Sequence, residues 1–365
     1  METIRILILI GFFSIARTLW AQSVEFPSKS STSPTKKDTT SSGNANRFTL
    51  NAYGDLYLGF ATGLPNKKPG FLYNHKINNQ VRTNLLLIQG TYEAERFHAK
   101  VGLMTGDYVR FNLKEEPLWA KPWYEAYVGL LPSVKSKLWL DAGIFSSYIG
   151  FENPITTENT MLTRSIVADN TPYYFSGIRG HYRSKGDRYE VLGFVLNGWQ
   201  RIAWNKEQAK PSYGLSVKRM FTPKASLSYG VFYGTVYPDS LKINRLYQQV
   251  IGSVVEETWT YFASVDVGIE KGYLWGAAQI TAQWRFHDAW AFSQRIETFV
   301  DPHNRCVNVG ATTPSQFGAV ALCLEHKMRD ALSLRLEPKC IFATEPIIKG
   351  KTWEIQTHAS LAFRL

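Results

Sequence analysis

The chain has 365 residues, of which 44% are hydrophobic and 14% aromatic, and it carries a formal charge of +11 at pH 7. This length is ample for a single large domain with its own core. After the first twenty or so residues, no stretch approaches the roughly 18 apolar residues that a membrane-spanning helix needs, which excludes a helical membrane domain. The basic balance suits anionic partners, but the sequence has no nucleic-acid recognition motif, so no nucleic-acid partner is expected.

The first residues have the pattern of an export signal. Arg5 precedes the apolar run ILILIGFFSIA, and Ala21 supplies a small residue before the expected cut, so residues 1–21 are predicted to be a signal peptide. Residues 22–46 are rich in Ser, Thr and Lys and bury too little apolar surface to offset their ordering entropy. We expect them to form a flexible periplasmic lead before a domain that spans residues 47–365.

Beyond residue 46, the chain is a succession of runs in which apolar and polar residues alternate. In residues 273–286, YLWGAAQITAQWRF, one face carries Leu274, Ile280 and Trp284, and the other carries Gln279 and Arg285. A period of two predicts a strand. About fifteen such runs can be traced, each of roughly 9–14 residues, close to the length with which a tilted strand crosses a bilayer. The last run, TWEIQTHASLAFRL, continues the pattern to the end of the sequence.

These runs predict an all-β fold, a closed antiparallel transmembrane β-barrel, because lipid offers no partner to the backbone groups of an open sheet edge. Forward and backward traces disagree somewhere in residues 236–272, where one strand is missed or split. We therefore expect 16 strands, with 14 as the alternative. Short turns alternate with longer loops over much of the chain, which indicates short periplasmic turns and long outer loops.

The longest irregular connection, residues 146–172, separates KLWLDAGIF from YYFSGIRGHY. In the first of these strands, Leu138, Leu140, Ala142 and Ile144 are expected to share one face. A connection of this length inside a compact domain is usually functional or disordered. We consider it a candidate constriction loop that either folds into the lumen or caps the outer mouth; its charged candidates are Glu152, Glu158, Arg164 and Asp169.

Charged residues also recur on the polar faces of the strands, where burial would be costly unless they are hydrated or closely paired. A water-filled lumen removes that cost. The candidate lumen-facing residues are Arg179, Arg285, Arg295, Glu297, Arg335 and Glu337. This pattern indicates a passive pore for small hydrophilic solutes or ions, with no chemical step, cofactor or metal, and the net charge suggests a weak preference for anions.

The segments DAGIFSSYIGFENP, RSIVADNTPYYFSGIR and VLNGWQRI resemble the β-barrel porin type 2 family, also called OmpL-like, of bacterial outer membranes. The resemblance is strongest over residues 141–202 and continues through RTNLLLIQGTYEA and QRIETFVDP. It implies an outer-membrane barrel with a pore-like role and no catalytic residues. The expected partners are outer-membrane lipids and lipopolysaccharide, the barrel-assembly machinery and small hydrophilic solutes; analogy with porins adds a homotrimer.

Two other functions compete with a pore. An outer-membrane enzyme would need a nucleophile beside a base. The local candidate pairs are His287 with Asp288 and Asp301 with His303. Because no serine motif accompanies either pair, we do not expect an enzyme. A barrel that binds a glycan or protein, or is purely structural, is the stronger alternative; Trp119, Trp123, Trp199 and Trp204 are its candidate stacking residues. Of the three cysteines, Cys306, Cys323 and Cys340, two could pair after export, or all three could be incidental apolar residues.

Overall fold

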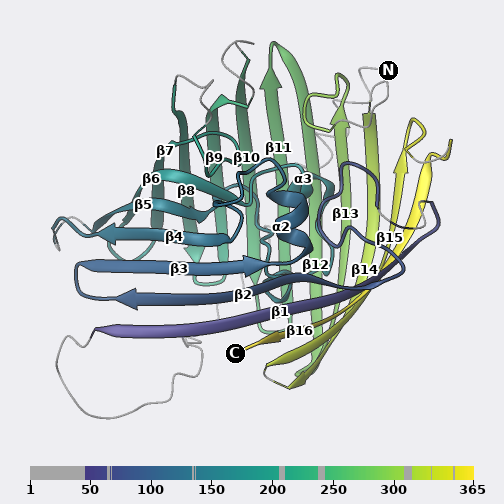
Figure 1. Cartoon of the computed structure of the whole chain (residues 1–365), viewed down its shortest axis with the longest axis horizontal. Coiled ribbons are helices and arrows are strands. Elements are labelled where there is room, and N and C mark those ends of the chain that lie inside the picture. The colour runs from purple at the N-terminus through teal and green to yellow at the C-terminus, as the bar shows by residue number, and fades with distance from the viewer. Residues whose placement is uncertain are drawn as a thin grey trace. The chain divides into compact units, whose positions relative to one another are not determined.

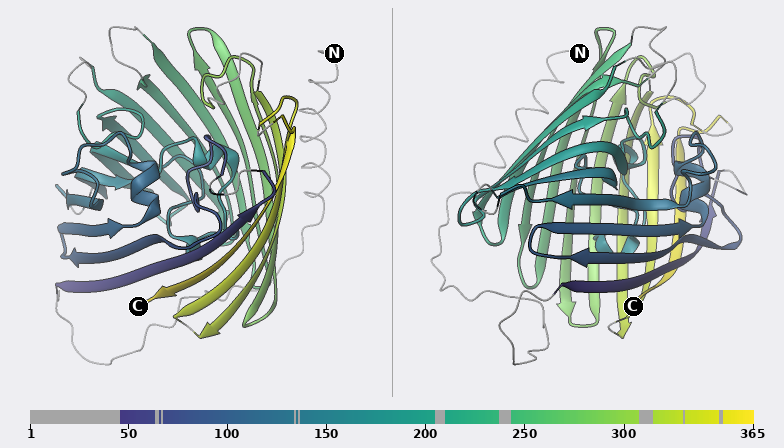
Figure 2. Two further views of the ribbon diagram at one scale, coloured as in Figure 1. Left: turned by 45° about the vertical axis from the view of Figure 1, so that its right-hand side comes forward. Right: turned by 60° about the vertical axis from the view of Figure 1, so that its left-hand side comes forward.

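The structure, a computed structural model, describes residues 46–63, 66, 68–133, 135, 137–204, 210–236, 243–307, 315–329, 331–347 and 350–365. The predicted signal peptide and the predicted lead up to residue 45 lie outside the described residues. The described residues form a closed antiparallel barrel of sixteen strands (Figures 1 and 2), which confirms the predicted fold class and the larger of the two strand counts. No helix within the described ranges is long and apolar enough to cross a membrane.

Each strand pairs with its neighbours in sequence, and β1 closes the ring against β16, with Leu56 opposite Leu361. The strands are β1 (Arg47–Ala61), β2 (Val81–Glu93), β3 (Phe97–Thr105), β4 (Trp123–Leu130), β5 (Leu138–Ser146), β6 (Tyr174–Arg183), β7 (Tyr189–Leu196), β8 (Ser212–Thr222), β9 (Ala225–Thr235), β10 (Asn244–Val255), β11 (Trp259–Glu270), β12 (Tyr273–His287), β13 (Trp290–Asp301), β14 (Ser315–Arg329), β15 (Leu332–Ala343) and β16 (Trp353–Arg364). Two short helices, α2 (Asp107–Asn112) and α3 (Ile166–Asp169), and the 3-10 turn η1 (Thr156–Glu158) lie in connections between strands.

Strand β10 is the one that the sequence pattern missed. It lies inside residues 236–272, where the two traces disagreed. Its inward face carries Tyr247 and Ile251, which are buried, and its outward face carries Gln248, whose side chain accepts a hydrogen bond from the Tyr229 hydroxyl. Large apolar residues inside and an amide outside blur the alternation by which a strand is recognised.

The connections differ between the two rims. In an up-and-down barrel every second connection lies at the same rim; the connections at one rim are short, such as residues 94–96, 223–224 and 288–289. The other rim carries the longer connections, including residues 62–80, 106–122, 147–173 and 197–211, with Lys271–Gly272 as a short exception. By the general rule for outer-membrane barrels, the rim with short turns faces the periplasm.

Along the strands, exposed apolar side chains alternate with buried polar ones. On β13, Ile296 is 59% exposed on the outer surface, whereas Arg295 and Glu297 on either side of it point inward and are buried. The same alternation runs along β12, β15 and β16. An apolar exterior around a polar interior is the arrangement of a barrel in lipid.

One expected strand face is wrong in detail. Leu138, Leu140 and Ala142 are exposed on the outer face of β5, but Ile144 is buried. The alternation breaks at Gly143, which has φ 135°. A β-carbon at Gly143 would lie 2.1 Å from the Ala126 carbonyl oxygen, so only glycine permits this backbone, and the residues after it leave the regular alternation.

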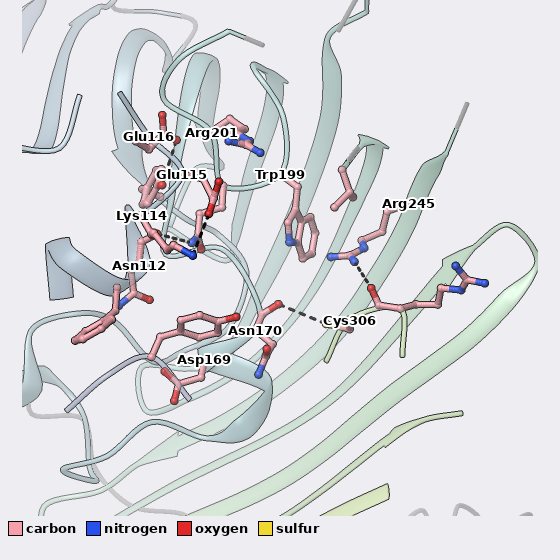
Figure 3. A pocket seen from close by; sticks show the side chains of 16 residues that line it. Asn112, Lys114, Glu115, Glu116, Asp169, Asn170, Trp199, Arg201, Arg245 and Cys306 are labelled. Carbon is pink, nitrogen blue, oxygen red and sulfur yellow. Dashed lines mark hydrogen bonds and ion pairs between the residues drawn. The ribbon is translucent and has the colours of Figure 1, made fainter. Parts of the chain in front are cut away.

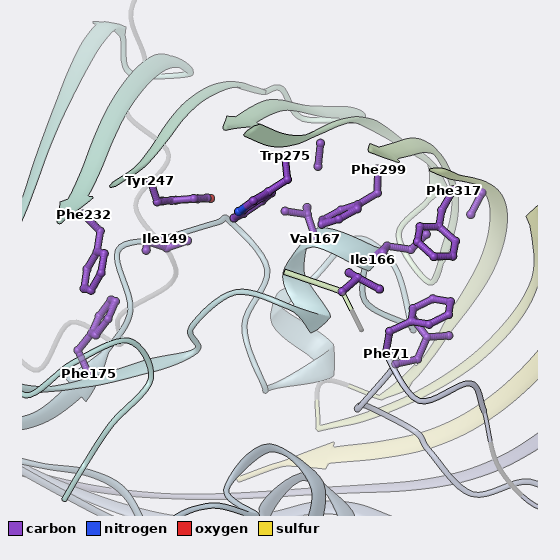
Figure 4. Packing of buried hydrophobic residues seen from close by; sticks show 14 of the residues in the cluster. Phe71, Ile149, Ile166, Val167, Phe175, Phe232, Tyr247, Trp275, Phe299 and Phe317 are labelled. Carbon is purple, nitrogen blue, oxygen red and sulfur yellow. The ribbon is translucent and has the colours of Figure 1, made fainter. Parts of the chain in front are cut away.

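The interior has its own apolar core. Figure 4 shows Phe175, Phe232, Tyr247, Trp275, Phe299 and Phe317 following one another along the inner wall, with Ile166 and Val167 of α3 packed against them. The ring centroids of Trp275 and Phe299 are 5.7 Å apart, as are those of Tyr247 and Trp275. This core fixes α3 against the wall and so determines where the connection that contains it lies.

The three cysteines are free thiols in the structure, with Cys323 buried and Cys306 and Cys340 half-buried. Cys323 packs with Met161, Leu162 and Ala321 in a small apolar cluster. The three sulfur atoms are not bonded to one another in the structure, and Cys323 packs as an apolar residue.

Candidate functional site

The connection between β5 and β6, residues 147–173, lies against the inner surfaces of widely separated strands. At one end, the side-chain amide of Gln249 on β10 accepts from Gly150 N (2.7 Å) and donates to Tyr148 O (2.8 Å). At the other end, the Thr156 hydroxyl donates to Asp55 on β1 at 2.6 Å. The connection, called here the internal loop, thus reaches across the lumen (Figures 1 and 2).

Arg295 on β13 is the main attachment for the middle of the internal loop. Its guanidinium lies 3.1 Å from Glu152 and donates to the carbonyl oxygens of Thr163 (2.8 Å) and Arg164 (3.0 Å). On the wall beside it, Glu297 lies 3.3 Å from Arg295 and 2.8 Å from Lys339. Charges removed from water are tolerable only when paired and hydrogen-bonded in this way.

Strand β15 holds the next part of the internal loop through backbone groups. Arg335 donates to the carbonyl oxygens of Thr156 (2.7 Å) and Asn159 (2.9 Å), while Glu337 accepts from the backbone N–H groups of Leu162 (2.6 Å) and Thr163 (3.0 Å). Arg335 is also paired with Glu325 at 2.8 Å. These side chains satisfy backbone groups that an irregular, buried segment would otherwise leave without partners.

A second connection, residues 62–80 between β1 and β2, packs beside the internal loop. The Asn74 backbone N–H donates to Asp169 at 3.3 Å, and Asn170 donates to the Phe71 carbonyl oxygen at 3.0 Å. Lys68, buried in this connection, donates to Asn74 O at 3.1 Å. Removal from water lowers the pKa of the Lys68 amine to about 7.

The four charged residues predicted for the internal loop differ in burial and in the partners that they bond. Glu152 faces Arg295, as described, but Glu158 lies nearer the surface and pairs with Arg364 at 2.8 Å. Arg164 is buried and bonds the carbonyl oxygens of its own loop, including Leu162 O at 2.7 Å. Asp169 meets Asn74 rather than an arginine.

The predicted lumen-facing residues all lie on inward positions of their strands, in three groups. Arg295, Glu297, Arg335 and Glu337 come together on β13 and β15 under the internal loop. Arg179 is on the opposite wall, 2.6 Å from Asp141. Arg285 is at the rim with short turns, where its guanidinium lies 3.5 Å from the Glu257 carbonyl oxygen.

Several residues of this network were not predicted. Lys339 continues the inward series Arg335, Glu337, Lys339 at every second position, so the alternation could have identified it. Asp55 on β1 bonds both His75 (3.2 Å) and Thr156, residues 20 and 101 positions away. No local pattern in the sequence indicates such a contact.

The wall formed by β3 to β8 keeps solvent-accessible inward side chains. Lys100 is 28% exposed and lies 2.7 Å from Glu125, which is 5% exposed. Arg179 is 17% exposed beside Asp141, which is 1% exposed. In both pairs the cation faces the lumen and its carboxylate is set behind it.

At the rim with the longer connections the structure has a cavity of about 480 Å³ (Figure 3). Its lining includes Trp199 and Arg201 from residues 197–211, Arg245 at the start of β10, Glu116 after α2 and Asp169 at the end of α3. Several connections at this rim therefore surround one cavity, and the internal loop contributes Asp169 to its lining.

A comparison with models of protein families shows to which family the chain belongs. The family model described as "Putative beta-barrel porin-2, OmpL-like" matches residues 47–362. The chain belongs to this family. Its membership places this porin in the bacterial outer membrane, as the sequence predicted, and points to a channel rather than an enzyme. A comparison with curated proteins finds no match.

Solved structures with the same fold are also porins and channels. The anion-selective porin of Comamonas acidovorans is similar with a TM-score of 0.59 and 9% identity, covering 88% of this chain and 100% of that one. The outer-membrane channel DcaP of Acinetobacter baumannii has a TM-score of 0.58 and 10% identity, with 89% and 99% covered. OmpF of Salmonella typhi, in complex with daunomycin, has a TM-score of 0.57 and 10% identity, with 88% and 98% covered. At these identities the likeness shows the fold.

The two residue pairs considered as catalytic candidates, His287 with Asp288 and Asp301 with His303, make local contacts that hold turns and loops in this porin. His287 Nδ1 accepts from Ala289 N at 3.1 Å within a turn. Asp301 accepts from the backbone N–H groups of Arg305 (2.9 Å) and Cys306 (2.7 Å), and the His303 ring packs on Tyr273. Within the described ranges, no three His, Cys, Asp or Glu side chains are grouped as metal ligands.

Proposed function

We propose that this porin is a passive diffusion channel for small hydrophilic solutes and ions, with a weak preference for anions. The observation that carries the proposal is the asymmetry of the β3–β8 wall, where Lys100 and Arg179 reach solvent and their partners Glu125 and Asp141 do not. A lumen walled by low-dielectric protein concentrates ions opposite in sign to its exposed charges. The inward position of Lys218 on β8, opposite Glu190, adds a further cation to the same wall.

The internal loop supports this proposal because it fills the side of the lumen next to β13 and β15. The passage is then confined between the loop and the wall that carries Lys100 and Arg179. In this arrangement the loop limits solute size, and the accessible cations bias the charge of the solutes that pass.

The test is single-channel recording of the purified mature chain in a planar bilayer. Discrete current steps are expected, and in a KCl gradient the reversal potential should have the sign of a chloride preference. Arg179→Gln combined with Lys100→Gln should move the reversal potential toward zero or toward cation preference, whereas Arg219→Gln on the outer surface should not. A cation-selective current in the unmodified protein would contradict the anion preference.

The burial of the inward side chains favours a second function, a barrel that binds a glycan or protein partner without an open pore. Inward residues of β13 to β16, including Arg295, Glu325, Glu337, Glu354 and His358, are almost fully buried. A heat-modifiable, folded barrel that gives no current steps would support this second function and contradict the channel.

A further inference from the structure

Two histidines share the inner face of the β3–β8 wall with the cations described above. His98 on β3 comes two residues before Lys100, and His181 on β6 comes two residues after Arg179, so each histidine lies on the inward face of its strand. Strands β3 and β6 belong to the same wall (Figure 1). The two histidine side chains are 24% and 23% exposed, so solvent in the lumen reaches both imidazoles.

His98 is held in place by a bond that passes over β4. Its Nε2 lies 2.8 Å from Asp141 on β5, and the same carboxylate is bonded to Arg179 at 2.6 Å. Gly129 on β4 is in register with both His98 and Asp141, and a β-carbon at Gly129 would collide with both side chains. The missing side chain at Gly129 therefore leaves the room in which His98 reaches Asp141. The imidazole also packs on Trp139, with 4.5 Å between the ring centroids.

His181 is bonded to a second carboxylate in the same way. Its Nε2 lies 2.8 Å from Glu190 on β7, and Arg183 lies 3.2 Å from the same carboxylate. Lys218 on β8 is directly opposite Glu190 in the register of β7 and β8. Each of the two carboxylates, Asp141 and Glu190, is therefore shared between a histidine and an arginine.

Other charged and titratable groups also face the two imidazoles. On β2, the exposed Glu93 is opposite His98 in the register of β2 and β3. The residues directly opposite His181 on its two neighbouring strands, Trp139 and Leu192, are uncharged. The remaining groups are Lys100 and the Tyr127 ring beside His98, and Arg179 and Arg183 beside His181 on its own strand.

The two histidines control most of the net charge of this wall. The inward side chains of β3 to β8 include four lysines and arginines and three carboxylates: Lys100, Arg179, Arg183, Lys218, Glu125, Asp141 and Glu190. The wall thus has one net positive charge when both histidines are neutral and three when both are protonated. Histidine changes its charge between pH 5 and 8, whereas lysine, arginine and carboxylate side chains ordinarily keep theirs in that range.

We propose that His98 and His181 determine how strongly the channel prefers anions, with a weak preference when they are neutral and a strong one when they are protonated. This inference rests on the proposed channel function. Two unit charges about 8 Å from a passing ion, screened by about 0.1 M salt, raise the local concentration of an anion about twofold and lower that of a cation about twofold. The permeability ratio of Cl⁻ to K⁺ therefore rises about fourfold when both histidines are protonated.

The experiment is measurement of the reversal potential of the purified mature chain in a KCl gradient at pH 8 and at pH 5. The permeability ratio of Cl⁻ to K⁺ should be about fourfold higher at pH 5. The double variant His98→Gln with His181→Gln keeps an N–H donor for each carboxylate, and its ratio should be the same at both pH values. His326→Gln, on the outer face of β14 where the imidazole stacks on Trp290, is the matched control and should retain the change.

A pH-independent ratio in the unmodified channel, or a pH dependence that persists in the double glutamine variant, would overturn the proposal. The variant His98→Lys with His181→Lys supplies the complementary test, because lysine is charged at both pH values. This variant should have at pH 8 the ratio that the unmodified channel has at pH 5. A ratio at pH 8 no higher than that of the unmodified channel would also contradict the assignment.

A second measurement needs no ion flow through the barrel. Thr91→Cys places a thiol on β2 directly opposite Lys100, and the rates of its reaction with an anionic and a cationic methanethiosulfonate are compared in detergent, with the unmodified protein as the blank. The ratio of the two rates is independent of the thiolate fraction, since both reagents attack the same thiolate. It should shift about fourfold toward the anionic reagent between pH 8 and pH 5, and the double glutamine variant should abolish the shift.

The two measurements separate this inference from the proposed function. The shift in reagent rates without bilayer current removes the channel alone, and an anion-selective current without pH dependence removes the role of the histidines alone. A thiol at position 91 that neither reagent reaches would overturn the inference as well, because the wall would then not be open to solutes.

Discussion

Arg295 on β13 lies 3.1 Å from Glu152 of the internal loop, and both side chains are buried. The pair joins the barrel wall to the segment that crosses the lumen. A buried charge is tolerated only while its partner is present, since removal of either partner leaves the other uncompensated and away from water. The position of the internal loop therefore depends on a match between residues 143 positions apart.

The variant Arg295→Met should release the middle of the internal loop. It leaves Glu152 without its cation and removes the donors to Thr163 O and Arg164 O. Loss of one partner of a buried pair costs about 3–5 kcal/mol. We expect larger and noisier single-channel currents from a barrel that still migrates as folded before heating. Arg285→Met at the short-turn rim is the matched control, and identical conductance in both variants would show that Arg295 does not fix the loop.

A second prediction concerns Gly143, where the β5 backbone has φ 135°. A valine at this position would place its β-carbon 2.1 Å from Ala126 O, so Gly143→Val should prevent assembly of the β4–β5 pair and of the barrel. Gly193→Val is the control, since a β-carbon at Gly193 meets nothing within 4 Å. The measurement is the heat-modifiable shift on a gel. A folded Gly143→Val barrel would contradict the steric argument.

The barrel was predictable from the sequence because its signal is local. Alternation along single strands such as β13 and β16 identifies the lipid face and the inward face without knowledge of the partner strands. Strand β10 was not predicted because each of its faces mixes polar and apolar residues: Tyr247 and Ile251 face inward beside Gln249, while Gln248 faces outward beside Val250. The burial of Ile144 was not predicted because the sequence does not show that Gly143 adopts a positive φ.

The candidate site was predictable only in part. The alternation of polar and apolar residues predicted which side chains face inward, such as Arg295, Glu297, Arg335 and Glu337. It did not predict the residues of the internal loop to which they bond. The contact of Asn74 with Asp169, for example, joins two long connections whose bonded residues are 95 positions apart in the sequence. Roles for Lys68 and His75 therefore required the three-dimensional structure.

A third prediction tests the lipid-facing surface. Ile296 is at the centre of β13 and 59% exposed on the outer face. Arginine on the lipid face of an outer-membrane barrel costs about 2–4 kcal/mol near the midplane. Ile296→Arg should lower the free energy of unfolding in lipid vesicles by that amount, measured by denaturant titration with Ile296→Val as the control. No loss of stability would place Ile296 away from the hydrocarbon.

The last prediction concerns Lys68, whose amine is buried between the two inner connections. Burial is the main cause that lowers the pKa of this amine from 10.5 to about 7. The positive charges of Lys339 and Lys76 lower the pKa further, and the negative charges of Asp169 and Glu337 raise it in part. When residues 62–80 undock, the amine regains the higher pKa, so between pH 7 and 10.5 the undocked state binds more protons than the docked state. Docking should therefore become more stable as the pH rises through this window, and should not change through Lys68 below it.

Hydrogen exchange measures this effect directly. The backbone N–H groups of Asn74 and Ile77, which bond Asp169 and the Tyr57 hydroxyl, should be better protected at pH 9 than at pH 7 after correction for the intrinsic rate of exchange. Lys68→Met removes the titrating amine and should make protection independent of pH over that range. Lys114→Met, at an exposed lysine, should retain the dependence. The same pH dependence in Lys68→Met would assign it to a group other than Lys68.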